Sequence, residues 1–273
     1  SIRRQRQMCI RDRYLLDRRD SSVIVGKHFI VTGGTSGLGL EITKKLLKKG
    51  AYITLIVRST EKFENINFNP YKHRVSMIKC NLQDTSQIDT ISKSLCYPID
   101  GIIYSAGLGF FKSIQSHSLE ETLETYDVNV LGFITLFKTV KPYLTMNASI
   151  VAISSQAAFV TQANAAFYGS SKAALNGVLN ALRIEEQGFH VMTVNPGPIN
   201  TPFHKKADPS LKYANKYASL MIDPKILAED IVKGIITRKV EINKPLWMNP
   251  LLKLYQLAPR KIEKYFTSLL SLI

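Results

Sequence analysis

Tyr168 and Lys172 are the side chains whose types and spacing most clearly suggest chemistry. They lie in a segment of helical periodicity, where residues four apart share one face. A free tyrosine has a pKa of about 10 and is a poor acid or base at neutral pH. A lysine ammonium on the same face favours the phenolate and brings the tyrosine nearer to working pH. The pair therefore predicts a proton-transfer group, although this spacing also occurs by chance on surface helices.

Ser155 lies thirteen residues before Tyr168, just after an apolar run typical of a buried strand. Its hydroxyl can donate a hydrogen bond to a substrate carbonyl, or to the alkoxide that develops from it. Other chemistries find less support. The run Gly169-Ser170-Ser171 is not the G-x-S-x-G turn of a serine hydrolase. The five histidines show no ligand spacing, so we expect no metal site.

A glycine-rich segment, TGGTSGLG at residues 32–39, connects the first predicted strand to the first predicted helix. Glycines permit positive φ angles and close approach of a pyrophosphate, and the helix N-terminus supplies free N–H groups. A tight turn without a ligand is the alternative, but a glycine cluster in the first βα turn favours a nucleotide. No P-loop motif is present, so we predict a dinucleotide site. Its expected contacts here are Gly33, Thr35, Ser36, Gly37, Leu38 and Gly39.

The residues that follow the second predicted strand indicate which dinucleotide binds. An acidic residue there would bind the ribose hydroxyls of NAD, whereas an arginine accommodates the 2′-phosphate of NADP. The sequence has Arg58 and Ser59 at this point, and no acid before Glu61. We expect Arg58 to bind the phosphate and Ser59 to add a hydrogen bond, the alternative being a solvated surface arginine. NADP(H) is therefore the predicted cofactor, in preference to NAD(H).

From Gly26 onward, short apolar runs alternate with amphipathic segments, the pattern of repeated βαβ units and a doubly wound parallel sheet. No internal repeat or linker divides the chain, so we expect a single α/β domain over residues 22–273. Residues 202–222 have little periodicity and predict a long loop that serves as a lid. The predicted strands are 28–32, 52–57, 75–79, 99–104, 149–154, 190–195 and 240–243, and the predicted helices are 38–49, 84–95, 118–143, 166–187 and 224–238.

Taken together with PGPINT at residues 196–201, these motifs resemble the short-chain dehydrogenase/reductase (SDR) family over roughly residues 26–240. The resemblance implies a Rossmann-type, seven-stranded parallel sheet flanked by helices. It also implies hydride transfer between a nicotinamide and a carbonyl or alcohol carbon. In that scheme Tyr168 is the general acid of reduction and Ser155 orients the carbonyl. Lys172 lowers the tyrosine pKa and binds the nicotinamide ribose, and Asn129 holds a water of the proton relay.

The resemblance also extends to other cofactor contacts. It implies that the adenosine lies near Asn81, Leu82, Ser105, Ala106 and Gly107, and that Pro196, Gly197, Ile199 and Thr201 enclose the carboxamide. Two positions depart from the family pattern. The usual Asn-Asn-Ala-Gly begins here with Tyr104, and an amide, Asn81, replaces the usual aspartate. We expect both changes to preserve cofactor binding.

The substrate pocket is expected to be lined by the lid and by Gln156, Phe159, Phe167 and Phe203. This aromatic lining favours a hydrophobic or aromatic carbonyl or alcohol, while two lid lysines, Lys205 and Lys206, leave acidic substrates open. The competing function is a sensor or scaffold that binds NADP(H) without turnover. The intact catalytic set argues against it, because a sensor has no need of a tuned tyrosine.

Composition places the chain among soluble globular proteins, with 45% hydrophobic residues and a net charge of +15. Three scattered cysteines suit reduced thiols, and hence the cytoplasm. The arginine-rich residues 1–21 could form a basic arm for nucleic acid or anionic lipid. They resemble translated adapter sequence, however, and we expect a disordered, non-native extension and no nucleic-acid partner. The family resemblance favours a homodimer or homotetramer built on helices 118–143 and 166–187.

The tail at residues 247–273 is apolar with lysines at intervals, and Pro250 and Pro259 divide it into short helices. Three roles stay open for it. It could pack into the core or a dimer interface, cover the substrate pocket, or make weak peripheral contact with a membrane surface.

Overall fold

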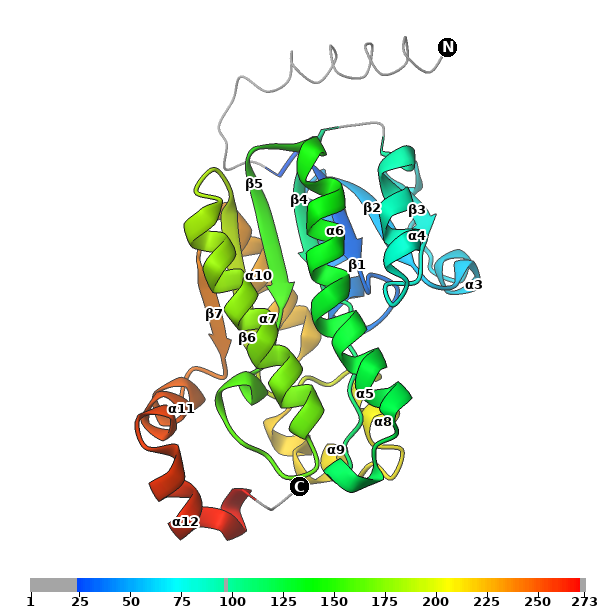
Figure 1. Ribbon diagram of the computed structural model, residues 1–273. Coiled ribbons are helices and arrows are strands. Elements are labelled where there is room, and N and C mark those ends of the chain that lie inside the picture. The colour runs from blue at the N-terminus through cyan, green and yellow to red at the C-terminus, as the bar shows by residue number, and fades with distance from the viewer. Residues whose placement is uncertain (1–23, 96–97, 271–273) are drawn as a thin grey trace.

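The computed structural model describes residues 24–95 and 98–270, so the arginine-rich extension at 1–21 lies outside the described residues. Seven parallel strands form one sheet in the order β3-β2-β1-β4-β5-β6-β7, which confirms the predicted doubly wound fold (Figure 1). The strands are β1 (His28–Thr32), β2 (Tyr52–Val57), β3 (Val75–Lys79), β4 (Ile99–Tyr104), β5 (Leu144–Ile153), β6 (His190–Pro196) and β7 (Glu241–Lys244).

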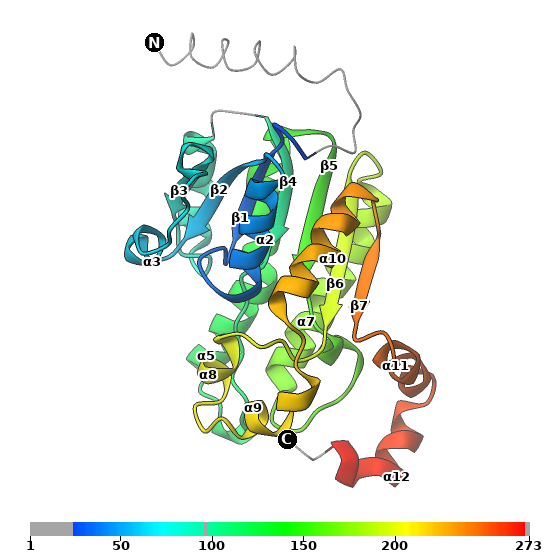
Figure 2. The same ribbon diagram turned by 180° about the vertical axis from the view of Figure 1, so that it is seen from behind.

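Helices cover both faces of the sheet, so its central strands carry near-continuous apolar runs. On one face, α2 (Gly37–Lys48) packs beside α10 (Pro224–Ile236), with Ile42 and Ile231 fully buried (Figure 2). On the other face lie α4 (Thr85–Thr90), α6 (Gly132–Val140) and α7 (Ala166–Glu185), around a core that includes Leu136 and Leu179. These two cores hold the strand ends in place, and the site lies on those ends.

The strand order reverses between β1 and β4, which are neighbours although β2 and β3 intervene in sequence. Ligands of open α/β sheets bind in the crevice at such a switch point, beyond the carboxyl ends of the strands. The register pairs Thr32 with Tyr104, so the glycine turn after β1 and the segment after β4 meet at this crevice.

Four segments differ from the sequence-based expectation. The predicted helix 118–143 consists of α5 (Leu119–Tyr126), one π-helical turn (Asp127–Leu131) and α6. Helix α6 ends at Val140 and is followed by a short turn that contains Pro142. Strand β5 begins five residues earlier than predicted. The lid at 202–222 is not an irregular loop, because it holds α8 (Phe203–Ala207) and α9 (Lys212–Lys216). A short helix after β2, α3 (Thr60–Glu64), was not predicted.

The tail forms two short helices as predicted, α11 (Met248–Leu257) and α12 (Pro259–Leu270). They lie at the same end of the molecule as the lid, beyond the carboxyl ends of the strands (Figure 1). In the part of the chain that the structure describes, no helix is both long and apolar enough to cross a bilayer.

Candidate active site

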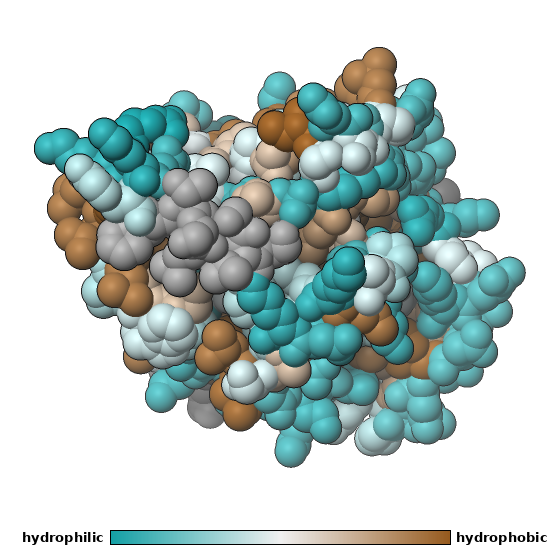
Figure 3. Space-filling view, turned by 90° about the horizontal axis from the view of Figure 1, so that it is seen from below, coloured by the Kyte–Doolittle hydropathy of each residue, from teal (hydrophilic) through white to brown (hydrophobic). Residues whose placement is uncertain are grey.

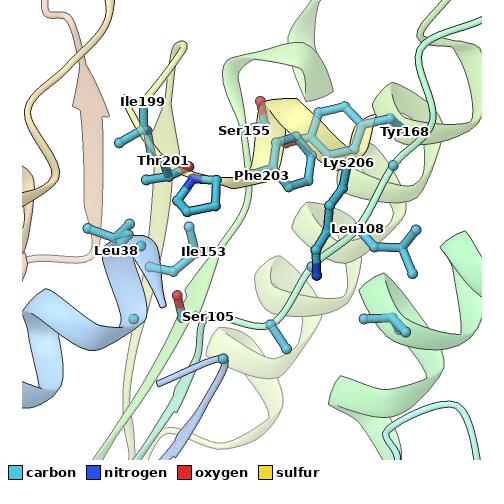
Figure 4. Close-up of a pocket in the computed structure, with 18 of the residues that line it drawn as sticks. Leu38, Ser105, Leu108, Ile153, Ser155, Tyr168, Ile199, Thr201, Phe203 and Lys206 are labelled. Carbon is cyan, nitrogen blue, oxygen red and sulfur yellow. The ribbon is translucent and has the colours of Figure 1, made fainter. Parts of the chain in front are cut away.

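A cavity of about 530 Å³ lies at the carboxyl ends of the strands and gathers most of the predicted site residues (Figure 4). Asn129, Phe159 and Phe167 do not line it. The predicted residues that do are Gly33, Thr35, Ser36, Gly37, Leu38, Gly39, Arg58, Ser59, Asn81, Leu82, Ser105, Ala106, Gly107, Ser155, Gln156, Tyr168, Lys172, Pro196, Gly197, Ile199, Thr201 and Phe203.

The glycine turn has no room for side chains at two of its positions. Gly33 has a φ of +65°, and a Cβ there would lie 2.8 Å from the Ala106 nitrogen. A Cβ on Gly39 would lie 2.3 Å from the Gly33 carbonyl oxygen. Ser36, the N-cap of α2, makes no side-chain hydrogen bond to the helix. The first N–H groups of α2 are therefore available to an anion at this end of the cavity.

Three cations line the cavity beyond the end of β2: Arg58, Lys62 of α3 and Lys206 of α8. Burial lowers the pKa of Lys206, and the positive charges of Lys62 and Arg58 lower it further. Figure 4 shows the Lys206 side chain extending from the lid into the cavity. From the sequence, Lys206 was expected only to favour an acidic substrate, and Lys62 was not predicted to be in the site. The three together make this end of the cavity suited to a dianion such as a phosphate monoester.

The proton-transfer residues share one face at the start of α7, as the spacing predicts. Lys172 is 3% exposed, its Nζ lies 5.9 Å from the centre of the Tyr168 ring, and it donates to the Ile153 carbonyl at 2.9 Å. Burial lowers the pKa of Lys172 to about 8. Ser155 follows the end of β5, and its hydroxyl donates to the Pro196 carbonyl at 3.4 Å. Figure 4 places Ser155 and Tyr168 at one end of the cavity and Leu38 of the glycine turn at the other.

The electrostatic expectation for Tyr168 is not met in this structure. Burial raises the pKa of its hydroxyl above the ordinary value, and the hydrogen bond with Ser155 offsets only part of that rise. The Lys172 ammonium donates to a backbone carbonyl, and burial disfavours its own charge. Tyr168 is therefore a protonated phenol here, which is the form that can give a proton to an oxygen.

Asn129 lies in the π-helical turn and is fully buried. Its Oδ1 accepts from the Leu108 N–H at 3.0 Å, while its Nδ2 donates to the Leu108 carbonyl at 2.8 Å and to Ser171 Oγ at 2.9 Å. These bonds tie the segment after β4 to α7. A Cβ on Gly107 would lie 3.3 Å from Asn129 Oδ1 and 3.1 Å from Lys172 Nζ, so Asn129 lies close behind a cavity wall that Gly107 and Lys172 form.

Tyr104, where the sequence departs from the family pattern, has a structural function of its own. It is fully buried, and its hydroxyl donates to the Val128 carbonyl at 2.5 Å. That bond holds the π-helical turn next to Asn129. At the other departure, Asn81 Nδ2 donates to Gln83 Oε1 at 3.2 Å, so this amide already has a partner.

Aromatic rings cover the catalytic end of the cavity. Phe203 lies 5.5 Å and Phe111 5.7 Å from the Tyr168 ring, centre to centre, and Phe111 is 4.8 Å from Tyr213 of α9. The Phe111 N–H donates to the Ala207 carbonyl at 2.7 Å, which fastens the lid to the segment after β4. Phe111 was not predicted from the sequence, and Tyr213 was expected only as part of the lid. An aromatic pair, Phe110-Phe111, directly after the glycines at 107 and 109 was the signal available.

Two aromatic residues that we expected in the substrate pocket lie elsewhere. The Phe167 ring packs against His117, with centres 4.7 Å apart. Phe159 ends the short helical turn after β5. In their place Met248, the first residue of α11, lines the cavity together with Phe111 and Tyr213.

Comparison with known proteins agrees with this geometry. The sequence profile described as short chain dehydrogenase matches residues 27–212. The chain belongs to the short-chain dehydrogenase family. Among relatives of this oxidoreductase family, 3-dehydrosphinganine reductase of Arabidopsis thaliana is 31% identical over 188 residues, which cover 66% of this chain. The chain spans 58% of the length of that relative.

Solved structures share the fold. A short-chain dehydrogenase from Burkholderia cenocepacia in complex with NADP has a TM-score of 0.73 at 20% identity, covering 89% of this chain and 98% of that one. A short-chain dehydrogenase/reductase from Burkholderia phymatum in complex with NAD has a TM-score of 0.77 at 15% identity, covering 88% and 96%. At these identities the likeness concerns the short-chain dehydrogenase fold.

Proposed function

We propose that this short-chain dehydrogenase uses NADP(H) to reduce a carbonyl compound, or to oxidise the corresponding alcohol. The observation that carries the proposal is the convergence of Ser155, Tyr168 and Lys172 at one end of a cavity whose other end is a glycine turn with three cations. A proton donor and an anion site in one continuous cavity suit a dinucleotide and a small substrate bound end to end.

The residues present fit a nicotinamide dinucleotide. The glycine turn and the first N–H groups of α2 would hold the pyrophosphate, and Lys172 the nicotinamide ribose. Pro196, Gly197, Ile199 and Thr201 line the cavity where the carboxamide would lie. When bound, the cofactor supplies or accepts the hydride.

The protein's own contribution to the reaction is proton transfer. In the reducing direction, Ser155 donates a hydrogen bond to the substrate carbonyl oxygen, and Tyr168 gives its proton to that oxygen. The raised pKa of Tyr168 keeps this proton in place before substrate arrives. The Lys172 ammonium, with a pKa of about 8, then stabilises the phenolate and is close enough to neutrality to pass on a proton. Asn129 keeps the neighbouring backbone rigid, and its predicted relay water stays a prediction.

The preference for NADP(H) over NAD(H) rests on the cation cluster. Arg58, Lys62 and Lys206 all line the cavity where the 2′-phosphate would lie. Titration with NADPH and with NADH, followed by nicotinamide fluorescence, tests this preference. We expect tighter binding of NADPH and loss of the difference in Arg58→Ala, while equal affinities in the parent protein would refute it.

The substrate end of the cavity suits an apolar compound that carries a hydrogen-bond donor. Phe111, Phe203 and Tyr213 supply apolar surface. Gln156 and His204 also line the cavity, and neither of their buried acceptors, Gln156 Oε1 and His204 Nδ1, has a hydrogen-bond partner among the described residues. His204 Nε2 lies 2.8 Å from the Ile199 carbonyl and carries the ring proton, so Nδ1 can only accept. A hydroxyl or amine on the substrate would satisfy such acceptors.

Tyr168→Phe separates catalysis from the competing function, an NADP(H)-binding sensor or scaffold. The substitution removes only the hydroxyl, so NADPH affinity is expected to stay within about twofold while turnover falls by about 10²–10⁴. Asn215→Ala, a substitution at an exposed position of the lid, is the control for activity lost during expression and purification of a variant. Undiminished turnover of a good substrate in Tyr168→Phe would refute the catalytic assignment.

We also propose that the protein forms a homodimer or homotetramer. Leu119 and Leu123 of α5 and Ile184 of α7 are all more than half exposed, on the helices that sequence analysis assigned to subunit contacts. Sedimentation velocity tests this: Leu123→Lys is expected to reduce the mass of the particle, and a monomeric parent protein would refute it.

A further inference from the structure

The tail helix α11 is apolar on two faces, one buried against the protein and one exposed. Its inward face carries Met248, which lines the cavity, and the buried Tyr255. The Tyr255 hydroxyl accepts from the Thr161 N–H at 3.2 Å and donates to Glu263 of α12 at 2.6 Å. The two neighbours of Thr161 in the chain, Val160 and Gln162, also line the cavity. The inward face of α11 therefore packs beside the active-site cavity, with Met248 in the cavity wall.

The outward face of α11 has no covering in the described chain. Trp247, Leu251 and Leu254 follow one another at helical spacing and are 55%, 57% and 60% exposed. Leu246 and Leu257 extend this surface and are more exposed still. We call these five residues the tail patch. Monomeric soluble proteins seldom leave so many large apolar side chains together in water unless the surface binds something.

Positive charge surrounds the tail patch. On α11 and α12 the exposed basic residues are Lys253, Arg260, Lys261 and Lys264. The single acid of these two helices, Glu263, is paired with Arg260 at 2.6 Å. The neighbouring lid adds the exposed lysines 205, 212 and 216. Figure 3, which views this end of the molecule, shows hydrophobic residues set among hydrophilic ones.

This combination suits an anionic lipid surface better than a second copy of the chain. In a symmetric dimer through the tail patch, identical surfaces would face each other and bring like charges together. Interface cores are also depleted in lysine. Leucines that enter the acyl boundary, a tryptophan at headgroup depth and flanking lysines are the composition of an interfacial helix.

We propose that the tail patch docks the protein on an anionic membrane surface, with the mouth of the active-site cavity beside the bilayer. The docking is independent of the catalytic assignment. Its consequence for the substrate rests on the proposed function: an apolar carbonyl compound dissolved in the bilayer could enter past Met248 without crossing bulk water.

Trp247 is the only tryptophan of the chain, so its fluorescence reports on the patch directly. The full chain is mixed with vesicles of phosphatidylcholine alone, or of phosphatidylcholine with phosphatidylserine. We expect a blue shift of the emission and co-sedimentation with the phosphatidylserine vesicles, weakened by salt. Lipids with brominated acyl chains are expected to quench the emission. Leu251→Glu and Leu254→Glu are each expected to weaken binding about tenfold or more.

Met146→Glu is the matched control, because Met146 is 87% exposed at the start of β5, at the opposite end of the strands from the tail. It is expected to bind vesicles as the parent protein does.

An unshifted emission with phosphatidylserine vesicles overturns the proposal, and so does vesicle binding that Leu251→Glu and Leu254→Glu leave unchanged. If these variants instead convert a dimer to a monomer in sedimentation velocity with vesicle binding intact, the patch is a subunit interface. NADPH affinity, measured in parallel, is expected to be unchanged, so loss of docking is distinguished from failure of the cofactor proposal.

Discussion

Replacing the buried Lys172 by methionine is expected to stabilise the protein while it abolishes turnover. The lysine pKa falls from 10.5 to about 8 on burial, and each pKa unit corresponds to about 1.4 kcal/mol, so the charged amine costs about 3 kcal/mol at neutral pH. Methionine has nearly the same shape and no charge. It gives up the hydrogen bond to the Ile153 carbonyl, a loss of about 1 kcal/mol. The net expectation for Lys172→Met is a gain of about 2 kcal/mol.

The pH dependence gives this prediction its sharpest test. Between about pH 8 and 10.5 the unfolded chain still binds the lysine proton and the folded protein does not, so the stability of the parent protein rises with pH relative to the variant. The advantage of Lys172→Met is therefore expected to shrink from about 2 kcal/mol at neutral pH to nothing near about pH 10. Urea unfolding at several pH values measures it. Lys138→Met, on the exposed side of α6, is expected to change stability by less than about 0.5 kcal/mol at any of them. A variant less stable than the parent at neutral pH, or a difference that does not vary with pH, would refute the reasoning.

Three further substitutions test other parts of the site. Tyr104→Phe leaves the buried Val128 carbonyl without its donor and is expected to cost about 1–3 kcal/mol in urea unfolding; a loss below about 0.5 kcal/mol would mean that the bond does not hold the π-helical turn. Gly33→Ala places a Cβ 2.8 Å from the Ala106 nitrogen at a φ of +65°, so NADPH binding is expected to weaken at least tenfold in fluorescence titration, whereas Gly177→Ala, where the space is open, is expected to have no effect. Lys206→Gln is expected to weaken NADPH binding about fivefold and leave NADH binding unchanged, and an equal effect on both cofactors would place the amine away from the 2′-phosphate.

Sequence analysis predicted the parts of the site that depend on local pattern. Apolar runs marked all seven strands, and the i, i+4 spacing placed Tyr168 and Lys172 on one helix face, as the structure has them. The pKa of Tyr168 could not be predicted from the sequence. It depends on the burial of Tyr168, against whose ring Phe111 and Phe203 pack, and on the carbonyl to which Lys172 donates. These groups come from segments distant in sequence.

The π-helical turn could not be predicted from the sequence either. The helix pattern runs through residues 119–140, and its one glycine, Gly132, comes only after the irregular turn at 127–131. The apolar periodicity alone therefore indicates one regular helix. The turn is fixed by the Tyr104 hydroxyl, 24 residues away in sequence, and by the bonds of Asn129 to Leu108 and Ser171. A π-helical insertion in a helix often marks a functional site, and here it carries the one predicted catalytic residue that does not line the cavity.

The structure of the tail shows why the sequence alone could not distinguish between three roles for it. A helix that is apolar on one face covers a single surface, but α11 directs Met248 to the cavity and leaves Trp247, Leu251 and Leu254 exposed to solvent. Hydrophobic periodicity cannot tell these two faces apart, because both consist of large apolar side chains at helical spacing. In the structure, one of these faces contributes Met248 to the wall of the pocket. Cover of the pocket and contact with a membrane are therefore compatible functions of a single helix, and each can be removed by substitution without touching the other.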